Sequence, residues 1–322
     1  MLLKLVPDNT DIKFTSIRFM AAALSALLVV ASIVAVSTLG LNFGVDFRGG
    51  VTIEVADDEP IDAEAVRVAV SALNLGDVKV QSIQDFAGGT EGVVVSVEQQ
   101  AIEGDASDNE NAQFDALAEV KTAVSALLGD GVDFRREDVV GPTVSGELIQ
   151  KGIIAVILSI VGMLVYIWFR FEWQFSVGAI VALVHDVIIT LGMFAVTRLE
   201  FNLPIIAAIL TIVGYSMNDT VVVYDRVREN LRRFKKKPLR EVLDLSINDT
   251  LSRTVMTSVT TLIALVALYI VGGEVLRGFT FAMIWGVLIG TYSSIFVAAP
   301  ILLTVGVKRD WSKVSAGEPQ QA

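Results

Sequence analysis

One acidic residue, Asp219, lies inside a long apolar stretch and is the first candidate for chemistry. No other carboxylate occurs in 205–223. Asp219 stands six residues before Asp225, or roughly 9 Å inside the apolar segment at about 1.5 Å per helical residue. A lone carboxylate at such depth is suited to load and release protons. Asn218 and Thr220 flank it, and we assign all three to a proton pathway.

A cation for this carboxylate is available in the next apolar segment. Arg253 stands near its start, and antiparallel packing of the two segments would bring it toward Asp219. Arginine stays charged, so it can favour an ionised carboxylate without titrating itself. Alternatively, the Arg253 side chain extends to the membrane interface. Residue chemistry alone leaves both readings open.

A second polar pair, His185 and Asp186, lies near the middle of another apolar segment. Charged side chains at such depth are costly, by about 2.5–3.5 kcal/mol, and normally face the protein interior. The pair either locks helix packing or takes part in proton movement, and we include both residues in the candidate pathway.

Glycine-rich motifs lie on either side of a long polar region. The first includes Gly44, Asp46, Gly49 and Gly50, where glycine permits tight backbone geometry. A phosphate-binding loop would need a Gly-x-x-x-x-Gly-Lys-Ser/Thr pattern, which the sequence lacks. We therefore expect a structural turn at the membrane surface and no nucleotide chemistry.

The second motif includes Gly141, Pro142 and Gly146 and leads into the next apolar segment. Glycine and proline break regular structure, so this motif is expected to be either a hinge or a rigid connector. Gly214 opens the segment that carries Asp219, and we assign it a structural role.

Composition narrows the classes of site. The 322 residues include no cysteine and one histidine, which excludes disulfides, thiol chemistry and histidine-rich metal sites. With no nucleophile–base pair and no nucleotide loop evident, we expect no enzyme activity, no metal and no cofactor. Net charge is −11, but it is unevenly spread: residues 41–147 carry 22 acidic and 6 basic side chains, whereas 225–253 carry nine basic and five acidic ones.

The apolar residues, 53% of the chain, occur in blocks long enough to cross about 30 Å of hydrocarbon. We place six transmembrane helices at 19–40, 151–170, 175–197, 203–224, 254–273 and 280–305. The first is too long for a cleavable signal peptide and is expected to be an anchor. The remaining five form a bundle within 148–305.

Basic loops remain in the cytoplasm, so the loop 225–253 sets the orientation. Alternation then predicts that the N-terminus (1–18) and the tail (306–322) are cytoplasmic. The acidic region 41–147 falls outside, which in a Gram-negative cell is the periplasm.

Residues 41–147 are expected to form one folded domain. Apolar alternation predicts strands at 51–55, 77–84, 92–97 and 132–140, and helical spacing predicts helices at 61–73 and 112–128. The order β-α-β-β-α-β is that of a ferredoxin-like α+β domain. Residues 99–111 lack periodicity and are expected to form a loop.

Together these motifs resemble the SecF family of the SecDF protein-export complex, which belongs to the resistance-nodulation-division superfamily. The resemblance covers the whole chain and is carried by Gly44–Gly50, Gly141–Leu148, Ala182–Val187 and above all Gly214–Asn230. It implies that Asp219 and Arg253 match the intramembrane acidic and basic residues of the family's proton path. It also implies SecD, the SecYEG channel, YajC, an exported polypeptide and the lipid bilayer as partners, with no nucleic acid.

The resemblance implies a function: coupling the proton-motive force to translocation of secreted polypeptides, in the bacterial inner membrane. Two alternatives remain from the residues. The chain is a passive assembly scaffold for the translocon, in which case tight packing at Gly286 and Gly290 matters more than Asp219. Or it is half of a proton-driven efflux transporter, which would require pairing that the sequence does not display.

Overall fold

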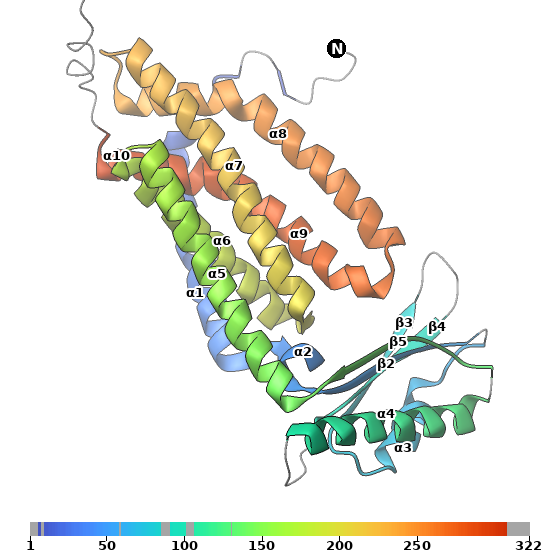
Figure 1. Cartoon of the computed structure of the whole chain (residues 1–322). Coiled ribbons are helices and arrows are strands. Elements are labelled where there is room, and N and C mark those ends of the chain that lie inside the picture. Colours follow the sequence, from blue (N-terminus) through green and yellow to red (C-terminus); the bar gives the residue numbers. More distant parts are fainter. Residues whose placement is uncertain are drawn as a thin grey trace, which may run out of the picture.

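The computed structural model describes residues 6–7, 10–57, 59–84, 91–100, 106–129 and 131–307. Within these residues, a helical bundle carries an extramembrane domain at one end (Figure 1). Six described segments are long and apolar enough to cross a membrane, as the sequence predicts. Five of them are the helices α1 (Arg18–Leu39), α5 (Pro142–Arg170), α6 (Trp173–Thr197), α7 (Leu203–Arg233) and α8 (Leu239–Val271).

The sixth span has a break in its hydrogen-bonding pattern. It consists of α9 (Gly273–Ser293), a π-helical turn η2 (Ser294–Ala298) and α10 (Ala299–Val305). Proline has no backbone N–H and clashes with the carbonyl four residues earlier, so Pro300 disfavours a regular α-helix just before it. The apolar pattern of 280–305 predicts the span but not this turn.

The helices α7 and α8 continue well beyond the apolar segments. The sequence predicts a basic loop over 225–253, but most of that region is helical, and only 234–238 links the two helices. An ion pair and a hydrogen bond support the extensions: Arg226 Nε lies 2.8 Å from Asp249 Oδ2, and Asn230 Nδ2 donates to Ser246 Oγ at 3.0 Å. Charged residues can continue a helix once it leaves the hydrocarbon, so hydropathy underestimates helix length here.

The extramembrane domain contains a four-stranded antiparallel sheet in the order β3-β4-β2-β5. Its elements are β2 (Gly50–Ala56), α3 (Ala63–Ser71), β3 (Val78–Gln84), β4 (Glu91–Val97), α4 (Ala106–Leu128) and β5 (Asp133–Val140). The helix α4 begins at Ala106, so the expectation of a loop over 99–111 is wrong for 106–111; residues 101–105 lie outside the described residues.

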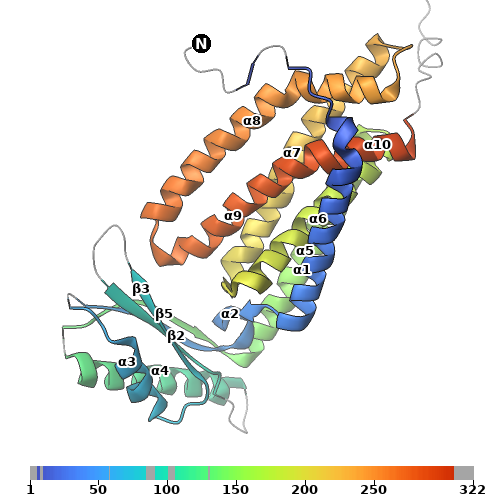
Figure 2. The ribbon, with the colours of Figure 1, turned by 180° about the vertical axis from the view of Figure 1, so that it is seen from behind.

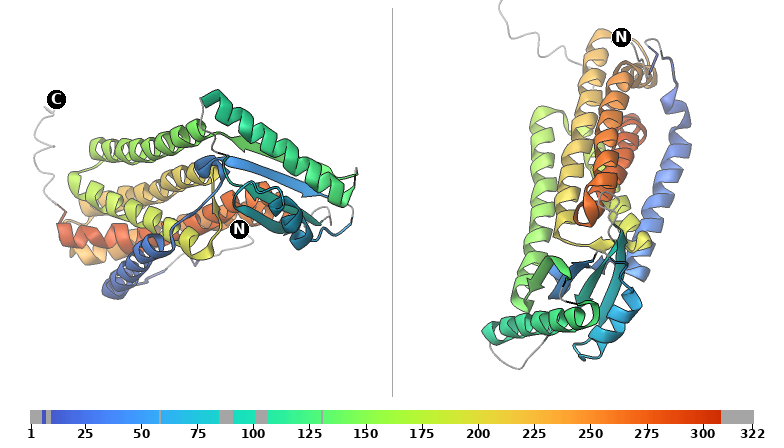
Figure 3. Two further views of the ribbon diagram at one scale, coloured as in Figure 1. Left: turned by 90° about the horizontal axis from the view of Figure 1, so that it is seen from below. Right: turned by 90° about the vertical axis from the view of Figure 1, so that its right-hand side faces the viewer.

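The two faces of this sheet differ. Helices α3 and α4 cover the face turned away from the bundle (Figures 1 and 3). That face supplies an apolar core from alternating strand positions, including Ile53 and Val95, packed on Val66 and Val120. The opposite face is polar and turned toward the membrane bundle.

Small residues let the membrane helices approach closely. A Cβ added at Gly286 of α9 would overlap the Ile212 side chain of α7, and one at Gly290 would lie 3.0 Å from Ser216 Cβ. On the back of the bundle, α1 runs along α6 (Figure 2), and a Cβ at Gly192 would overlap Ser32. Gly286 and Gly290 thus serve as packing residues, as their spacing predicts.

Candidate functional site

Asp219 is buried in the bundle, with 8% of its surface exposed. Its carboxylate accepts two hydrogen bonds from hydroxyls on two other spans. Thr254 of α8 donates to Oδ1 at 2.6 Å, and Ser294 of η2 donates to Oδ2 at 2.5 Å. The side chain therefore lies where α7, α8 and the sixth span meet.

His185 and Asp186 form a second buried site on α6. Their side chains are joined by a 2.9 Å contact between His185 Nδ1 and Asp186 Oδ1. Asp186 Oδ2 accepts from Ser216 of α7 at 2.6 Å and from Ser293 of α9 at 2.8 Å. The His185 ring stacks on Tyr292, whose hydroxyl donates to the Ala21 carbonyl of α1 at 3.0 Å.

The two buried carboxylates are linked through neighbouring residues. Ser293 contacts Asp186, and Ser294 contacts Asp219. Ser216, the other donor to Asp186, lies three residues before Asp219 on α7. The structure therefore brings together three of the predicted pathway residues: Asp219, Asp186 and His185.

Arg253 lies near enough to Asp219 for its positive charge to act on that carboxylate, but the two side chains make no direct contact. Its side chain is exposed on α8, and among the described residues no ion pair or hydrogen bond joins it to that carboxylate. The next residue, Thr254, makes the contact instead, because successive helical residues point about 100° apart. Asn218 is likewise exposed. Thr220, which follows Asp219 in the sequence, is buried.

The first glycine motif forms a junction between the extramembrane domain and the bundle. It comprises β1 (Asn42–Phe43) and the short helix α2 (Val45–Arg48), and β1 pairs in parallel with β6 (Glu200–Phe201). Asp46 Oδ2 accepts from the Leu203 N–H at 2.7 Å, which satisfies a backbone donor at the start of α7. Asp46 thus fixes the first turn of the helix that carries Asp219.

Glycine is required at several points of this junction. Gly49 and Gly50 have φ angles of +74° and +115°, which side chains rarely adopt. A Cβ at Gly44 would overlap the Glu200 carboxylate, and one at Gly50 would overlap the Val97 carbonyl. The prediction of a structural turn is consistent with this geometry.

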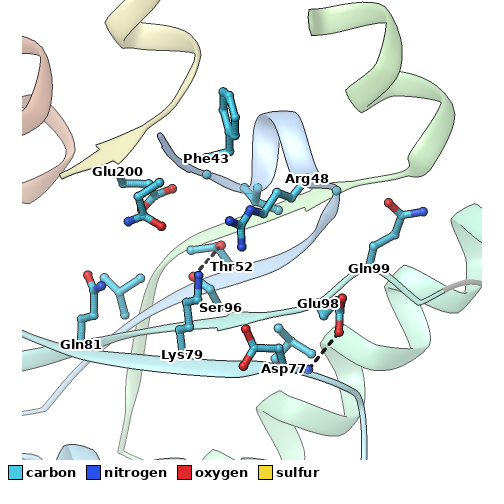
Figure 4. A pocket seen from close by; sticks show the side chains of 16 residues that line it. Phe43, Arg48, Thr52, Asp77, Lys79, Gln81, Ser96, Glu98, Gln99 and Glu200 are labelled. Atoms are coloured by element: carbon cyan, nitrogen blue, oxygen red, sulfur yellow. Dashed lines mark hydrogen bonds between the residues drawn. The ribbon is translucent and has the colours of Figure 1, made fainter. Parts of the chain in front are cut away.

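A cleft lies between the junction and the polar face of the sheet (Figure 4). Arg48, Lys79, Thr52 and Ser96 line it, with Glu200 at the end nearest the bundle. Burial raises the pKa of the Glu200 carboxyl, and the charges of Asp46 and Asp138 act in the same direction, whereas Arg136 and Lys79 oppose it.

The second glycine motif is helical rather than irregular. Gly141 alone separates β5 from α5, and Pro142 is the first residue of that helix. Proline suits this position because its missing N–H would have no helical partner there. No described atom lies within 4 Å of a Cβ placed at Gly141, Gly146 or Gly214, so packing does not demand glycine at these positions.

Sequence reasoning missed the hydroxyls that contact the carboxylates. Ser293, Ser294 and Thr254 are not among the residues that the sequence analysis assigns to the proton pathway. The signal in the sequence is a serine or threonine within an apolar segment that packs against the segment carrying the buried carboxylate. Their pairing depends on which faces of α8 and the sixth span meet α7, which apolar periodicity does not reveal.

Comparisons with known proteins match this chain to families of protein-export membrane proteins. A family described as "Protein export membrane protein SecD/SecF, C-terminal" matches residues 120–308, and one described as "SecD/SecF GG Motif" matches residues 34–56. The protein translocase subunit SecF of Cereibacter sphaeroides is 46% identical over 97% of this chain and 94% of its own length. That of Rickettsia rickettsii is 41% identical over 97% of both chains.

Longer proteins also match. The protein translocase subunit SecDF of Brucella abortus is 43% identical over 95% of this chain, which corresponds to 39% of that relative. The crystal structure of SecDF from Thermus thermophilus, a translocon-associated membrane protein, has a TM-score of 0.79 and 32% identity over 93% of this chain. This chain spans 39% of the length of that structure.

Proposed function

This chain belongs to the SecF family of protein translocase subunits, and from that premise we propose that it couples the proton-motive force to the export of polypeptides. Energy conversion in this proposal is transport rather than bond chemistry, so no enzyme activity is assigned. The observation that carries it is the buried Asp219 carboxylate, held by hydroxyls from two other spans.

Hydroxyl partners suit a group that changes its protonation state. A hydroxyl can donate to an ionised carboxylate or accept from a protonated one, whereas an arginine can only donate. Thr254 and Ser294 can therefore keep Asp219 hydrogen-bonded in both states. Each state would favour a different arrangement of α7 against its two neighbours, which converts proton binding into helix movement.

The outer end of α7 offers a route for that movement to reach the extramembrane domain. Asp46 holds the Leu203 N–H, and β1 pairs with β6 immediately before α7. From Leu203 to Asp219 the helix is continuous, spanning about 24 Å at about 1.5 Å per residue. A movement of α7 at Asp219 would thus act on the junction. It would also act on β2, which follows the junction directly in the chain.

The extramembrane domain is assigned here to the ferredoxin-like class. Its chain order β-α-β-β-α-β and sheet order β3-β4-β2-β5 support this assignment.

A partner is expected to complete the membrane bundle. In the most apolar stretches of α5 and α8, only 11% of the residues are buried within the described chain. This chain corresponds to 39% of the length of the relatives named SecDF, and the fused arrangement in those relatives favours SecD as the partner. In that assembly Arg253 and Asn218, exposed here, would face SecD or lipid. The SecYEG channel and YajC remain partners implied by the family.

The proposed location is the bacterial inner membrane. Arg232, Arg233 and the run Lys235–Lys237 lie at the α7–α8 link, and basic links face the cytoplasm. In this proposal both termini lie in the cytoplasm and the extramembrane domain lies in the periplasm.

Export with and without an imposed proton gradient tests the proposal. Asp219→Asn keeps the size of the side chain but cannot ionise, so the gradient-dependent part of export is expected to disappear while assembly with SecD persists. Asp225→Asn is the matched control, because Asp225 lies on the same helix but pairs with Arg170 at an exposed position. Full gradient-dependent export by Asp219→Asn would refute the proton role.

A passive scaffold is the second candidate, favoured by the close contact of α7 and α9 at Gly286. It predicts that Asp219→Asn is silent in the same export assay. It also predicts that Gly286→Leu, which forces the helices apart, abolishes export together with assembly.

A further inference from the structure

Two consecutive serines stand where the sixth span changes from α- to π-helix. Ser293 and Ser294 are both fully buried. Ser293 donates to Asp186 on α6 at 2.8 Å, and Ser294 donates to Asp219 on α7 at 2.5 Å. Neighbouring helical residues point about 100° apart, so one short segment serves carboxylates on two different helices.

The π-helical turn is held by α7 at both ends. At its start Ser294 binds Asp219, and at its end the Ala298 carbonyl accepts from the Tyr224 hydroxyl at 3.0 Å. Widened turns of this kind occur frequently at functional sites. A change at Asp219 would therefore act on a segment whose backbone is already less regular than an α-helix.

Each serine hydroxyl also has a second acceptor on its own helix. Ser293 Oγ lies 3.2 Å from the Gly290 carbonyl, and Ser294 Oγ lies 3.1 Å from the Thr291 carbonyl. A hydroxyl has one proton to donate, so it binds either its carboxylate or its own backbone fully. Each serine hydroxyl proton can therefore point either to the carboxylate or to the backbone carbonyl, with the oxygen in nearly the same place.

Resting on the proposed function, we propose that Ser293 and Ser294 are positioning residues that join Asp219 and the Asp186–His185 pair into one proton-handling unit. When Asp219 gains a proton, its carboxyl O–H can donate a hydrogen bond to Ser294 Oγ. Ser294 keeps its own proton and turns it to the Thr291 carbonyl. The adjacent Ser293 and its bond to Asp186 then respond through the shared backbone.

The surroundings of Asp186 are consistent with a role beyond packing. His185 Nε2 is buried and has no hydrogen-bond partner among the described residues. Ser216 ties Asp186 directly to α7 at 2.6 Å, one helical turn from Asp219. Among the described residues, the other titratable groups near the unit are Arg253, whose charge acts on Asp219, Tyr292, stacked on His185, and Tyr224, at the end of the π-helical turn.

The test uses the full chain with its partner subunit in the export assay with and without a proton gradient. Ser293→Ala and Ser294→Ala are compared with Ser258→Ala. Ser258 is also buried and bonds Thr291 across α8 and α9 at 2.7 Å, but it contacts neither carboxylate. We expect the gradient-dependent part of export to fall at least about tenfold in the first two variants, as for loss of a hydrogen bond to a charged group. Ser258→Ala should stay within about twofold of wild type.

A size-matched pair separates the hydroxyl from packing. Ser294→Thr retains the hydroxyl and Ser294→Val loses it at nearly the same volume, so Thr should retain gradient-dependent export and Val should lose it. Co-purification with the partner subunit reports assembly, and this pair decides the matter if Ser294→Ala fails to assemble. Equal export by Thr and Val, or equal losses in Ser294→Ala and Ser258→Ala, would overturn the inference.

The result with Asp219→Asn distinguishes the two levels of the account. If Asp219→Asn loses gradient-dependent export but both serine-to-alanine variants retain it, the serine link is wrong and the proton role stands. If Asp219→Asn itself retains export, the proposed function fails first.

Discussion

The buried carboxylates and the outer junction use acidic side chains in opposite ways. In the bundle, Asp219 and Asp186 are bound by the hydroxyls of serine and threonine, which can reverse their role. At the junction, Asp46 accepts from the backbone N–H of Leu203, which can only donate. The bundle site is thus built to tolerate a change in protonation, and the junction is built to hold one geometry.

Under the proposed function, this difference explains how protonation of Asp219 would be converted into movement of α7. A site that changes state needs a fixed attachment, or its shift would be lost in local rearrangement. The glycines of the junction, with left-handed backbone at Gly49 and Gly50, provide that rigidity. The helix α7 belongs to both regions.

Breaking the rigid region should have the largest effect on stability. Gly50→Ala forces a side chain into a φ of +115° and against the Val97 carbonyl, which we expect to destabilise the extramembrane domain by about 2–4 kcal/mol. Limited proteolysis and thermal unfolding of the full chain measure the loss. Gly141→Ala, which meets no described atom within 4 Å, should unfold like wild type; equal loss in both would contradict the assigned geometry.

Removing the attachment of α7 should have a smaller effect on stability but a clear one on coupling. Asp46→Ala leaves the Leu203 N–H without its acceptor, at a cost of about 0.5–2 kcal/mol, and should reduce gradient-dependent export. Asp46→Asn keeps an acceptor oxygen and should retain most of it. If alanine and asparagine behave alike, the hydrogen bond is not the coupling element.

Glu200, at the junction, should make the stability of the folded chain depend on pH. Burial raises the pKa of Glu200 above its unfolded value, so the folded state favours its neutral form. Its contribution to stability is complete below the unfolded pKa of about 4.3 and is lost as pH rises through the folded pKa. Glu200→Gln should therefore match wild type near pH 4 and unfold at a higher temperature than wild type near pH 8. A wild type that is the more stable at pH 8 would contradict the burial argument.

The smallest effect is expected within the bundle but away from the carboxylates. Gly214 lies inside α7 with no described atom within 4 Å of an added Cβ. Alanine favours helix over glycine by up to about 1 kcal/mol, so Gly214→Ala should be neutral or slightly stabilising in thermal unfolding. Clear destabilisation would mean that a partner packs against this position.

Much of the membrane architecture is readable from the sequence. Long, largely apolar runs predict the six spans because hydrocarbon disfavours unpaired backbone groups and charges. The buried position of Asp219 follows from the same pattern, since a carboxylate so deep must face protein. The strands of the extramembrane domain follow from alternation at residues such as Ile53 and Val95.

The partners of those residues were beyond that reasoning. Arg253 carries the obvious opposite charge, yet Thr254 faces Asp219, because the rotation of α8 depends on packing rather than on charge. The π-helical turn depends on how Pro300 is accommodated, which composition does not specify. The helices α7 and α8 run beyond the apolar segments to Arg233 and from Leu239, and contacts between them such as the Arg226–Asp249 ion pair are not part of the hydropathy pattern.

Proton movement itself is the most direct test of the account. The full chain is reconstituted with its partner subunit in liposomes that enclose a pH-sensitive dye. The outside solution is then made more acidic than the interior, so that protons are driven inward. We predict that wild type and Asp225→Asn admit protons at similar rates and that Asp219→Asn reduces the rate to that of protein-free liposomes. Undiminished proton entry through Asp219→Asn would contradict the central claim.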